Sequence, residues 1–302
     1  MRPGRSGRPG ASSRDVHVRH RACGPGKARR YRQPMTTYEL DRAIASTPGD
    51  DGLRHLVLTA DWNTPNGTAN GGYVLAVLAR ATLDEAATTA PAHPDLLTVS
   101  VSYFKPPTPG DAAVEVTTLR VGRRVSVHQA VLLQNGATVA HAVISLHDWD
   151  AAGSAEHTPH GAPPVGGPDD GVDVSGYVPS GAVPIVDRYE VRLPEVPGWL
   201  RGEPSGDPEA SVWVRPKDGR PIDAVAAAAI VDGYPPVTAE LGLLASATVQ
   251  LTVHLRRRPE TAWALMHVTT RHVVHGYHDE DVELWDDQGR LVAQSRQLAV
   301  LS

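Results

Sequence analysis

The amino-acid sequence predicts an α+β protein in which one structural unit occurs twice. Three segments of the first half, TVSVSYF, VEVTTLRVG and LLQNGATVAHAVISL, are matched in order by TVQLTVHL, MHVTTRHVV and LWDDQGRLVAQSRQLAVL in the second. Matching residues are separated by nearly constant offsets of 150, 152 and 153 positions: Thr98 and Thr248, Thr117 and Thr269, Gly136 and Gly289. A chance match would hold in one place only, so these offsets indicate a duplication. In each half an apolar helix precedes β-type segments, which is the order of a curved antiparallel sheet wrapped around one central helix.

The first unit is expected to span residues 35–150. A short helical segment and a strand around His55–Leu58 lead into the polar turn DWNTPNGTANGG. The following segment, GGYVLAVLARATLDEAA, is apolar on most faces, so we expect a helix enclosed by other structure. Three long segments rich in Val, Thr and Leu then predict strands, with turn signals at Thr108–Asp111 and Asn135–Gly136.

Residues 151–185 are dense in Gly, Pro, Ser and Ala and predict a linker. The second unit, residues 186–302, then repeats the pattern. VDRYEVRL and ASVWVRP predict strands, and PIDAVAAAAIVDGYPP predicts a second apolar helix that ends at Gly233 and the two prolines after it. Three long strands are expected between this helix and Ser302.

The charge distribution separates the first 34 residues from the rest of the chain. Residues 1–34 contain ten Lys or Arg and one acid, whereas the whole chain has 29 basic and 34 acidic residues and a net charge of −5. The acidic remainder argues against nucleic-acid binding as the main task. The basic tail is rich in Gly and Pro and is expected to be disordered. It is compatible with a nucleic-acid or membrane-surface arm, a targeting peptide, or upstream sequence translated from a misassigned start. The last is favoured, because MTTYELDRAIA at Met35 is typical of a natural N-terminus.

Several function classes are excluded or disfavoured by missing motifs. The single cysteine, Cys23, can form neither an internal disulfide nor a cysteine metal cage. No apolar run spans a bilayer and no signal-peptide core is present, so a cytoplasmic protein without membrane contact is expected. Phosphate-loop, G-x-S-x-G and G-x-G-x-x-G motifs are missing, and no cofactor is expected. The three histidines of RHVVHGYHDED need not converge, because residues three apart on a strand face opposite sides, so no metal site is expected.

A helix with a wrapping sheet, twice in one chain, resembles a double hotdog. The stretches SVWVRP, AIVDGYPPV, ASATVQLTVHLRR and GRLVAQSRQLAVL resemble the acyl-CoA thioesterase II family and related bacterial thioesterase-like proteins. NGGYVLAVLARA and TVSVSYFKPPTPG in the first half resemble the same family. The resemblance covers about residues 50–150 and 186–302, and its specificity lies in the order and spacing of several segments.

The resemblance implies a site in the second unit. In that family an aspartate after the second central helix, a threonine on the next strand and a glutamine on the last strand hold the attacking water. The matching residues are Asp232, Thr248 and Gln297. Gln294 is the competing glutamine, and only one of the two can face the site because they lie three residues apart on a strand. Trp213 and Arg215 fit the family pattern, but a structural role explains them equally well.

The chemistry of these residues is consistent with thioester hydrolysis. Asp232 would accept a proton from a water molecule as general base, while Thr248 and Gln297 would position that water. The helix that begins at Gly71 and Gly72 offers backbone N–H groups and a positive dipole end for a developing oxyanion. Arg256 and Arg257 could contact the phosphates of coenzyme A, or could equally be a solvated strand end.

The first copy lacks the complete set of site residues. Thr98 matches Thr248, but no acid occurs near Arg80–Thr82, where the counterpart of Asp232 falls, and Ile144 replaces Gln297. One site per chain is therefore expected, with acyl-CoA as substrate. Two alternatives stay open: a hotdog protein that binds acyl-CoA or acyl-carrier thioesters without hydrolysis, and an enoyl-thioester hydratase, which would need a histidine near the aspartate. Hotdog units hide their sheet edges by pairing, so a homo-oligomer is expected.

Overall fold

The computed structural model describes residues 38–301. The interpretations of the basic tail, of a start at Met35 and of Cys23 fall on residues outside this range. Among the described residues, no helix combines the length and the apolar character needed to cross a bilayer.

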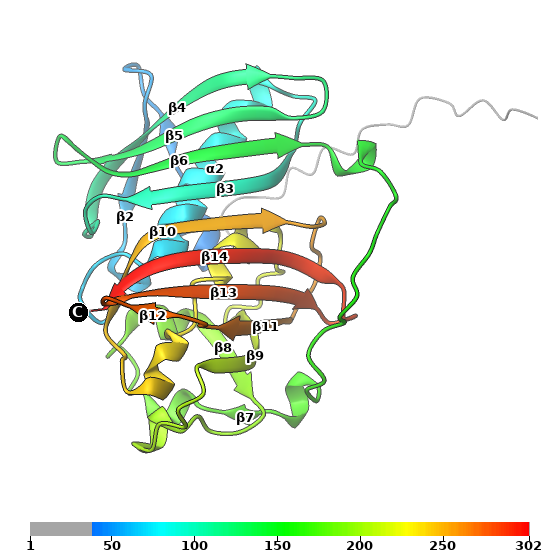
Figure 1. Cartoon of the computed structure of the whole chain (residues 1–302). Helices are drawn as coiled ribbons and strands as arrows, with labels where there is room; N and C mark the ends of the chain where they lie inside the picture. The colour runs from blue at the N-terminus through cyan, green and yellow to red at the C-terminus, as the bar shows by residue number, and fades with distance from the viewer. Residues whose placement is uncertain (1–37, 302) are drawn as a thin grey trace, which may run out of the picture. The chain divides into compact units, whose positions relative to one another are not determined.

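One antiparallel sheet of fourteen strands runs through both halves (Figure 1). The first half contributes six strands in the spatial order β1, β2, β4, β5, β6 and β3, and the second half contributes β10, β14, β13, β11, β9, β8 and β7. The bounds in the first half are β1 Thr47–Pro48, β2 Arg54–Leu58, β3 Asp95–Tyr103, β4 Gly110–Val121, β5 Ser126–Gln134 and β6 Ala137–His147. Those in the second are β7 Val172–Asp173, β8 Tyr189–Leu193, β9 Glu209–Pro216, β10 Ser246–Leu255, β11 Ala264–Thr269, β12 Val273–Val274, β13 Tyr277–Asp286 and β14 Leu291–Leu301. The short β12 pairs only with β13.

The two units join where β3 pairs with β10. In this pair Val101 lies directly opposite Leu251. These two residues are separated by the same offset of 150 positions that relates Thr98 to Thr248. Equivalent residues of the two copies therefore face each other, so a pseudo-two-fold axis passes through this pair. Next to it, the hydroxyls of Ser100 and Thr252 form a 2.8 Å hydrogen bond across the junction.

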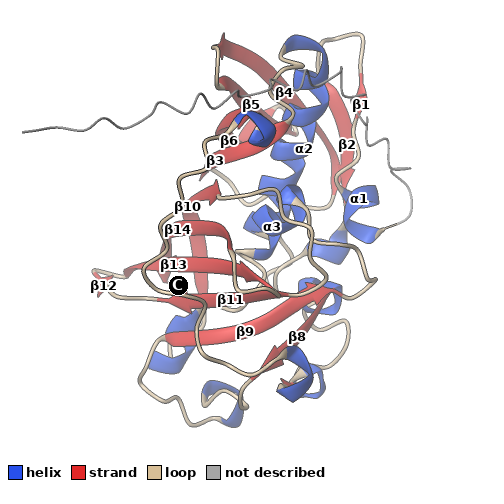
Figure 2. Ribbon diagram, turned by 90° about the vertical axis from the view of Figure 1, so that its right-hand side faces the viewer, coloured by secondary structure: helices blue, strands red, loops and turns tan. Residues whose placement is uncertain are grey.

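Two central helices lie on the same side of the sheet (Figure 2). Helix α2, Gly71–Thr89, is buried along most of its length, as its apolar sequence predicts. It is capped by Asn70, whose Oδ1 accepts a hydrogen bond from the backbone N–H of Tyr73. Helix α3, Ala224–Ile230, begins after the cap residue Asp223 and packs against β10 and β14. The five-residue helix α1, Glu39–Ala43, precedes β1.

Helix α3 is shorter than the sequence predicts. The sequence predicts a helix that ends at Gly233 and the prolines after it, whereas only the seven residues Ala224–Ile230 are helical. Helix α3 ends at Ile230. Pro235 and Pro236 prevent it from being resumed after Gly233, because a proline and the residue before it do not fit helical geometry. Asp232 consequently lies in a turn just beyond the helix rather than inside it.

The strand pattern also differs from the expectation of three long strands in each half. Four long strands follow the central helix in each half: β3 to β6 in the first, and β10, β11, β13 and β14 in the second. In the first half the chain reverses between Gly122 and Val125, where the N–H of Gly122 donates to the carbonyl of Val125. No Pro or Asn-Gly signal marks this turn, so the sequence pattern predicts one strand where the structure has two, β4 and β5. The expected turn at Asn135–Gly136 is present, and both residues adopt positive φ.

The segment between the two units is mostly irregular. Residues 151–185 contain isolated 3-10 turns and the two-residue strand β7. The 3-10 turns of the chain are η1 Ala60–Trp62, η2 Trp149–Ala151, η3 Pro168–Asp170, η4 Ser175–Tyr177, η5 Pro184–Arg188, η6 Trp199–Arg201 and η7 Val237–Leu241. The element order confirms the predicted α+β class, with a central helix on the concave side of each half of the sheet.

Candidate active site

Asp232 lies where the end of α3 meets the beginning of α2. Its carboxylate Oδ2 accepts hydrogen bonds from the backbone N–H of Gly72 at 2.8 Å and from Nδ2 of Asn70 at 3.0 Å. The same Nδ2 also donates to the backbone carbonyl of Asp232 at 2.8 Å. These hydrogen bonds join residues of the first copy to a residue of the second copy that is 160 or more positions away in the sequence.

Two glycines allow this close approach of the helices. A Cβ atom added at Gly72 would overlap the backbone carbonyl oxygen of Ala229. A Cβ atom at Gly71 would lie 2.8 Å from Oδ2 of Asp232. Tyr103 supports the same turn, because its hydroxyl donates to the carbonyl of Gly71 at 2.7 Å. The double glycine is therefore required by packing between the two copies.

Burial raises the pKa of Asp232 to about 6, while hydrogen bonds from Gly72, Asn70 and Gly71 act in the opposite direction. The carboxylate is ionised at neutral pH and lies at the positive end of the α2 dipole. The hydrogen bonds from Gly72 and Asn70 both go to Oδ2, which leaves Oδ1 outside this clamp. Burial, and next the negative charge of Asp232, keep the pKa of Tyr103 well above its usual value. Tyr103 is therefore neutral and can donate a hydrogen bond.

The structure gives Gly71 and Gly72 a different task from the predicted one. Both were expected to offer N–H groups to an oxyanion. Instead, the N–H of Gly72 donates to Asp232, and that of Gly71 also acts on this carboxylate. The α2 N-terminus therefore orients the predicted base, and the oxyanion role of the glycines is not favoured, because their donors are engaged.

Gln297 faces the helices, whereas Gln294 faces away from them. Gln297 is 6% exposed on β14, on the inner face with Ser295 and Ala299. Gln294 lies on the outer face, where it accepts a hydrogen bond from Nε of Arg256 and donates one to Glu283. The alternation of a strand thus places Gln297, of the two glutamines, on the side of Asp232.

Thr248 lies near the beginning of β10, opposite Ala299 and beside an irregularity in the strand register. Helix α3, which carries Asp232 at its end, packs against both β10 and β14. Thr248 and Gln297 are therefore on the two strands that adjoin this helix. Neither forms a direct hydrogen bond to Asp232 among the described residues.

Asn70 and Glu280 are not among the site residues that the sequence predicts. Asn70 was visible as an Asn before a Gly-Gly pair that opens an apolar helix, which is a cap signal. Glu280 is 5% exposed on β13, and its Oε2 accepts a hydrogen bond from the N–H of Val237 at 3.2 Å. Burial, and next the negative charge of Asp232, raise the pKa of Glu280 to about 8. The alternation of His278, Glu280, Val282 and Leu284 on the buried face was the signal for an inward-facing acid.

Arg256 and Arg257 follow the end of β10, the strand that has Thr248 near its beginning. Arg256 is eight residues beyond Thr248, which corresponds to about 26 Å along a strand. Nε of Arg257 donates to the carbonyl of Leu291, and Nε of Arg256 donates to Gln294. The assignment of these arginines to coenzyme A phosphates stays a prediction, and their position does not favour it.

Other residues singled out in the sequence have structural contacts. Nε1 of Trp213 donates to the carbonyl of Gly166, and Arg215 pairs with Glu190 and stacks over Trp263. In the histidine-rich segment, His275 and Gly276 form the turn between β12 and β13 with positive φ. Among residues 38–301, no group of three or more His, Cys, Asp or Glu side chains is arranged to hold a metal ion.

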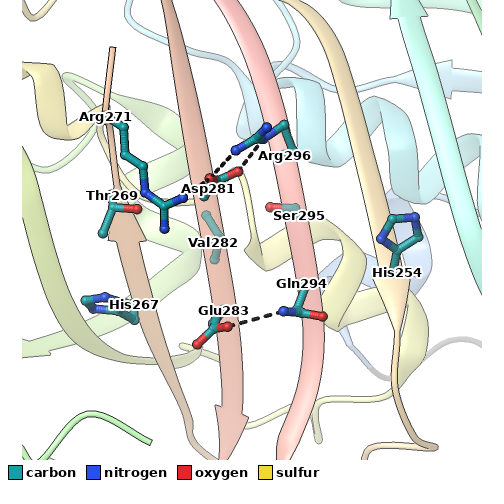
Figure 3. A pocket seen from close by; sticks show the side chains of 10 residues that line it. All are labelled: His254, His267, Thr269, Arg271, Asp281, Val282, Glu283, Gln294, Ser295 and Arg296. Carbon is teal, nitrogen blue, oxygen red and sulfur yellow. Dashed lines mark hydrogen bonds and ion pairs between the residues drawn. The ribbon is translucent and has the colours of Figure 1, made fainter. Parts of the chain in front are cut away.

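A polar cavity of about 390 Å³ opens on the other face of the sheet (Figure 3). Its walls include His254, His267 and the ion pair between Arg296 and Asp281, whose side chains point away from the helices in Figure 3. Asp281 and Glu283 alternate with Glu280 and Val282 along β13, so the sheet separates this cavity from Asp232. We therefore place the candidate site at the helix junction.

Comparisons with known proteins agree with this fold. Residues 58–147 match the model of the acyl-CoA thioesterase N-terminal domain, and residues 159–301 match that of the C-terminal domain. An uncharacterized Mycobacterium tuberculosis protein is 30% identical over 88% of this chain and 98% of its own length. A Thermobifida fusca structure provisionally described as a thioesterase II is 27% identical with a TM-score of 0.77, over 88% of this chain and 98% of that one. An Alicyclobacillus acidocaldarius protein with a hot dog fold has the same TM-score and coverage at 24% identity.

These matches cover both halves of the chain in the order that the duplication requires, and they confirm the predicted double hotdog. The chain therefore belongs to the acyl-CoA thioesterase family.

Proposed function

We propose that this protein hydrolyses acyl-CoA thioesters to a free acid and coenzyme A by means of an oriented water molecule. The observation that carries the proposal is the clamp on Asp232. Asn70 and Gly72 hold one carboxylate oxygen and leave Oδ1 open, and burial brings the pKa to about 6. A general base works best when its pKa lies close to the working pH.

In the proposed reaction, Oδ1 of Asp232 removes a proton from water while the water oxygen bonds to the thioester carbonyl carbon. The C–S bond then breaks, and the thiolate of coenzyme A takes the proton from the Asp232 carboxylic acid. Thr248 and Gln297 position the water by hydrogen bonds, which replaces a random encounter by a prearranged one. The Gln297 amide and the Thr248 hydroxyl can also donate to the oxyanion, whereas the N–H of Gly72 is engaged by Asp232.

The experiment is free-thiol release from short to long acyl-CoAs by the full chain and by Asp232→Asn. Release by the wild type alone would support hydrolysis with Asp232 as base, and would give the chain-length preference. No release from any substrate by folded protein would favour the non-hydrolytic binding protein. Release by both proteins at equal rates would reject Asp232 as base.

A further inference from the structure

Glu280 and Gln297 lie directly opposite each other on β13 and β14. They are 5% and 6% exposed, and both side chains point to the inner face of the sheet. Directly opposed side chains on one face of an antiparallel pair have Cβ atoms about 5 Å apart. The two groups are therefore within hydrogen-bonding reach of each other.

The same two strands contain a second Glu–Gln pair that serves as an internal comparison. Glu283 lies directly opposite Gln294 on the outer face. In that pair Nε2 of Gln294 donates to Oε1 of Glu283 at 3.2 Å, as the dashed line in Figure 3 shows. The strand geometry thus permits a side-chain hydrogen bond between a glutamate and a glutamine at opposed positions.

The surroundings of the inner pair favour a neutral glutamate. Asp232 and Tyr234, both after α3, interact electrostatically with Glu280, and Tyr234 also interacts with Glu240 in η7. His278 lies two positions away on the same buried face of β13. Burial lowers the pKa of His278, so that ring is neutral, and Asp232 is negative. With the pKa of Glu280 raised to about 8, its carboxyl carries a proton at neutral pH. A carboxylic acid donates one hydrogen bond, whereas a carboxylate only accepts.

We propose that Glu280 is a positioning residue that donates a hydrogen bond from its carboxylic acid to the side-chain carbonyl of Gln297. Oε2 of Glu280 is engaged by the N–H of Val237, so Oε1 carries the proton that faces Gln297. This bond turns the amide NH₂ of Gln297 toward the reacting water. In the outer pair, by contrast, the amide NH₂ is consumed by the carboxylate of Glu283. The inference rests on the proposed hydrolysis, since it gives Gln297 its orientation for that reaction.

The first test compares pH profiles of thiol release for the full chain, Glu280→Gln and Glu280→Ala, with Glu283→Gln as the matched control. In the wild type, kcat should fall above about pH 8, because ionised Glu280 no longer donates and places a second negative charge near Asp232. Glu280→Gln keeps a donor, so kcat at pH 7 should stay within about threefold of wild type and the alkaline decline should disappear. Glu280→Ala should lower kcat about tenfold or more with little change in KM. Glu283→Gln should behave as the wild type.

Identical pH profiles for wild type and Glu280→Gln would overturn the proposal, as would equal kcat losses in the Gln and Ala variants. A second measurement does not depend on catalysis: the infrared band of a protonated carboxyl group at pH 7, isolated as wild type minus Glu280→Gln. This infrared band should be present in the wild type. It should shift in Gln297→Leu, because that variant lacks the side-chain carbonyl that accepts the hydrogen bond. Lack of the band, or no shift, would reject the hydrogen bond even in a hydrolytically active protein. The band without thiol release would instead reject the proposed hydrolysis alone.

Discussion

The N-termini of α2 and α3 occupy equivalent places in the two copies but are closed in different ways. At α2, Oδ1 of Asn70 accepts one backbone N–H, that of Tyr73, while Nδ2 of Asn70 and the N–H of Gly72 donate to Asp232 in the other copy. At α3, Asp223 accepts the N–H groups of both Val225 and Ala226 and is itself bound by Arg220. One helix end is completed by a carboxylate from the opposite unit, and the other by its own cap. A duplicated fold can therefore keep one helix end for chemistry and use the other for stability.

The two halves of the sheet show the same contrast on the strands that flank the central β3–β10 pair. Gln297 lies opposite Glu280, whereas its counterpart Ile144 is fully buried and lies opposite His128. The His128 ring forms hydrogen bonds with Ser126 and Thr118, which belong to the same half of the sheet. On β3, the strand that contains Thr98, the first residue Asp95 forms an ion pair with Arg258 of the second copy. At the position that matches Gln297 the first copy thus carries an apolar side chain, and the polar neighbour opposite it is held by Ser126 and Thr118.

The largest expected effect separates the two helix-end aspartates. Asp232→Asn should lower kcat for thiol release by about 100-fold or more and leave KM little changed, because the general base is lost while an acceptor remains. Asp223→Asn should lower Tm and leave kcat within about twofold, because it only weakens the cap at α3. Steady-state kinetics and thermal unfolding of both variants check this. Equal losses of activity would erase the distinction between the two helix ends.

The second prediction concerns the glycine contact. Gly72→Ala places a methyl group against the carbonyl of Ala229, which separates the helices and weakens the bond from the Gly72 N–H to Asp232. Tm should fall and kcat should drop by about tenfold or more. The repeat counterpart Val225 already carries a side chain, so Val225→Ala should lower Tm without a comparable loss of kcat. Unchanged kinetics in Gly72→Ala would contradict the role of this contact.

Asn70→Ala should shift the pH dependence of catalysis. The hydrogen bond from Asn70 favours ionised Asp232, so its removal should raise the pKa above about 6 and move the acid limb of kcat/KM to higher pH. Loss of the cap at Tyr73 should also cost about 1 kcal/mol of unfolding free energy. Rates measured between pH 5 and pH 8, with chemical unfolding, give both quantities. An acid limb at the wild-type position would show that Asn70 does not tune Asp232.

Stability should depend on the inner glutamate in a defined direction. The folded-state pKa of Glu280, about 8, exceeds the ordinary value of 4.5, so the folded protein holds this proton more tightly than the unfolded chain. Stability from this group is complete at acid pH and is lost as pH rises through the window between these values. The Tm of Glu280→Gln should therefore fall less from pH 5 to pH 8.5 than that of the wild type. A parallel decline of the two Tm values would contradict the raised pKa.

The smallest effect is expected at the arginines beyond β10. Arg256→Ala and Arg257→Ala should change KM for acyl-CoA by less than about threefold, because both side chains bond to β14 at the end of β10 that is remote from Thr248. A large increase in KM for acyl-CoA, but not for an acyl thioester lacking the nucleotide, would instead restore the phosphate assignment.

Much of this arrangement could be predicted from the sequence. The constant offsets predicted the duplication, and the apolar run after Gly71 predicted the enclosed helix α2, because composition and spacing are local properties of the chain. The residues Asp232, Thr248 and Gln297 came from a family resemblance, and their catalytic roles stay proposals. The turn at Gly122–Val125 carries no Pro or Asn-Gly signal and is not predicted, and α3 ends at Ile230, slightly before the Gly233 at which the sequence predicts its end.

The sequence by itself determined that two similar units exist and that only the second carries an acid, a threonine and a glutamine in family order. Tertiary structure alone decided that Asn70 and Gly72 of the first unit hold Asp232 of the second, and that the inner glutamine lies opposite Glu280. Hydrogen bonds between residues 160 positions apart, and the pKa shifts that follow from shared burial, depend on how two surfaces meet. No local sequence pattern predicts the contact of Asn70 and Gly72 with Asp232, because the donors belong to one unit and the acceptor to the other.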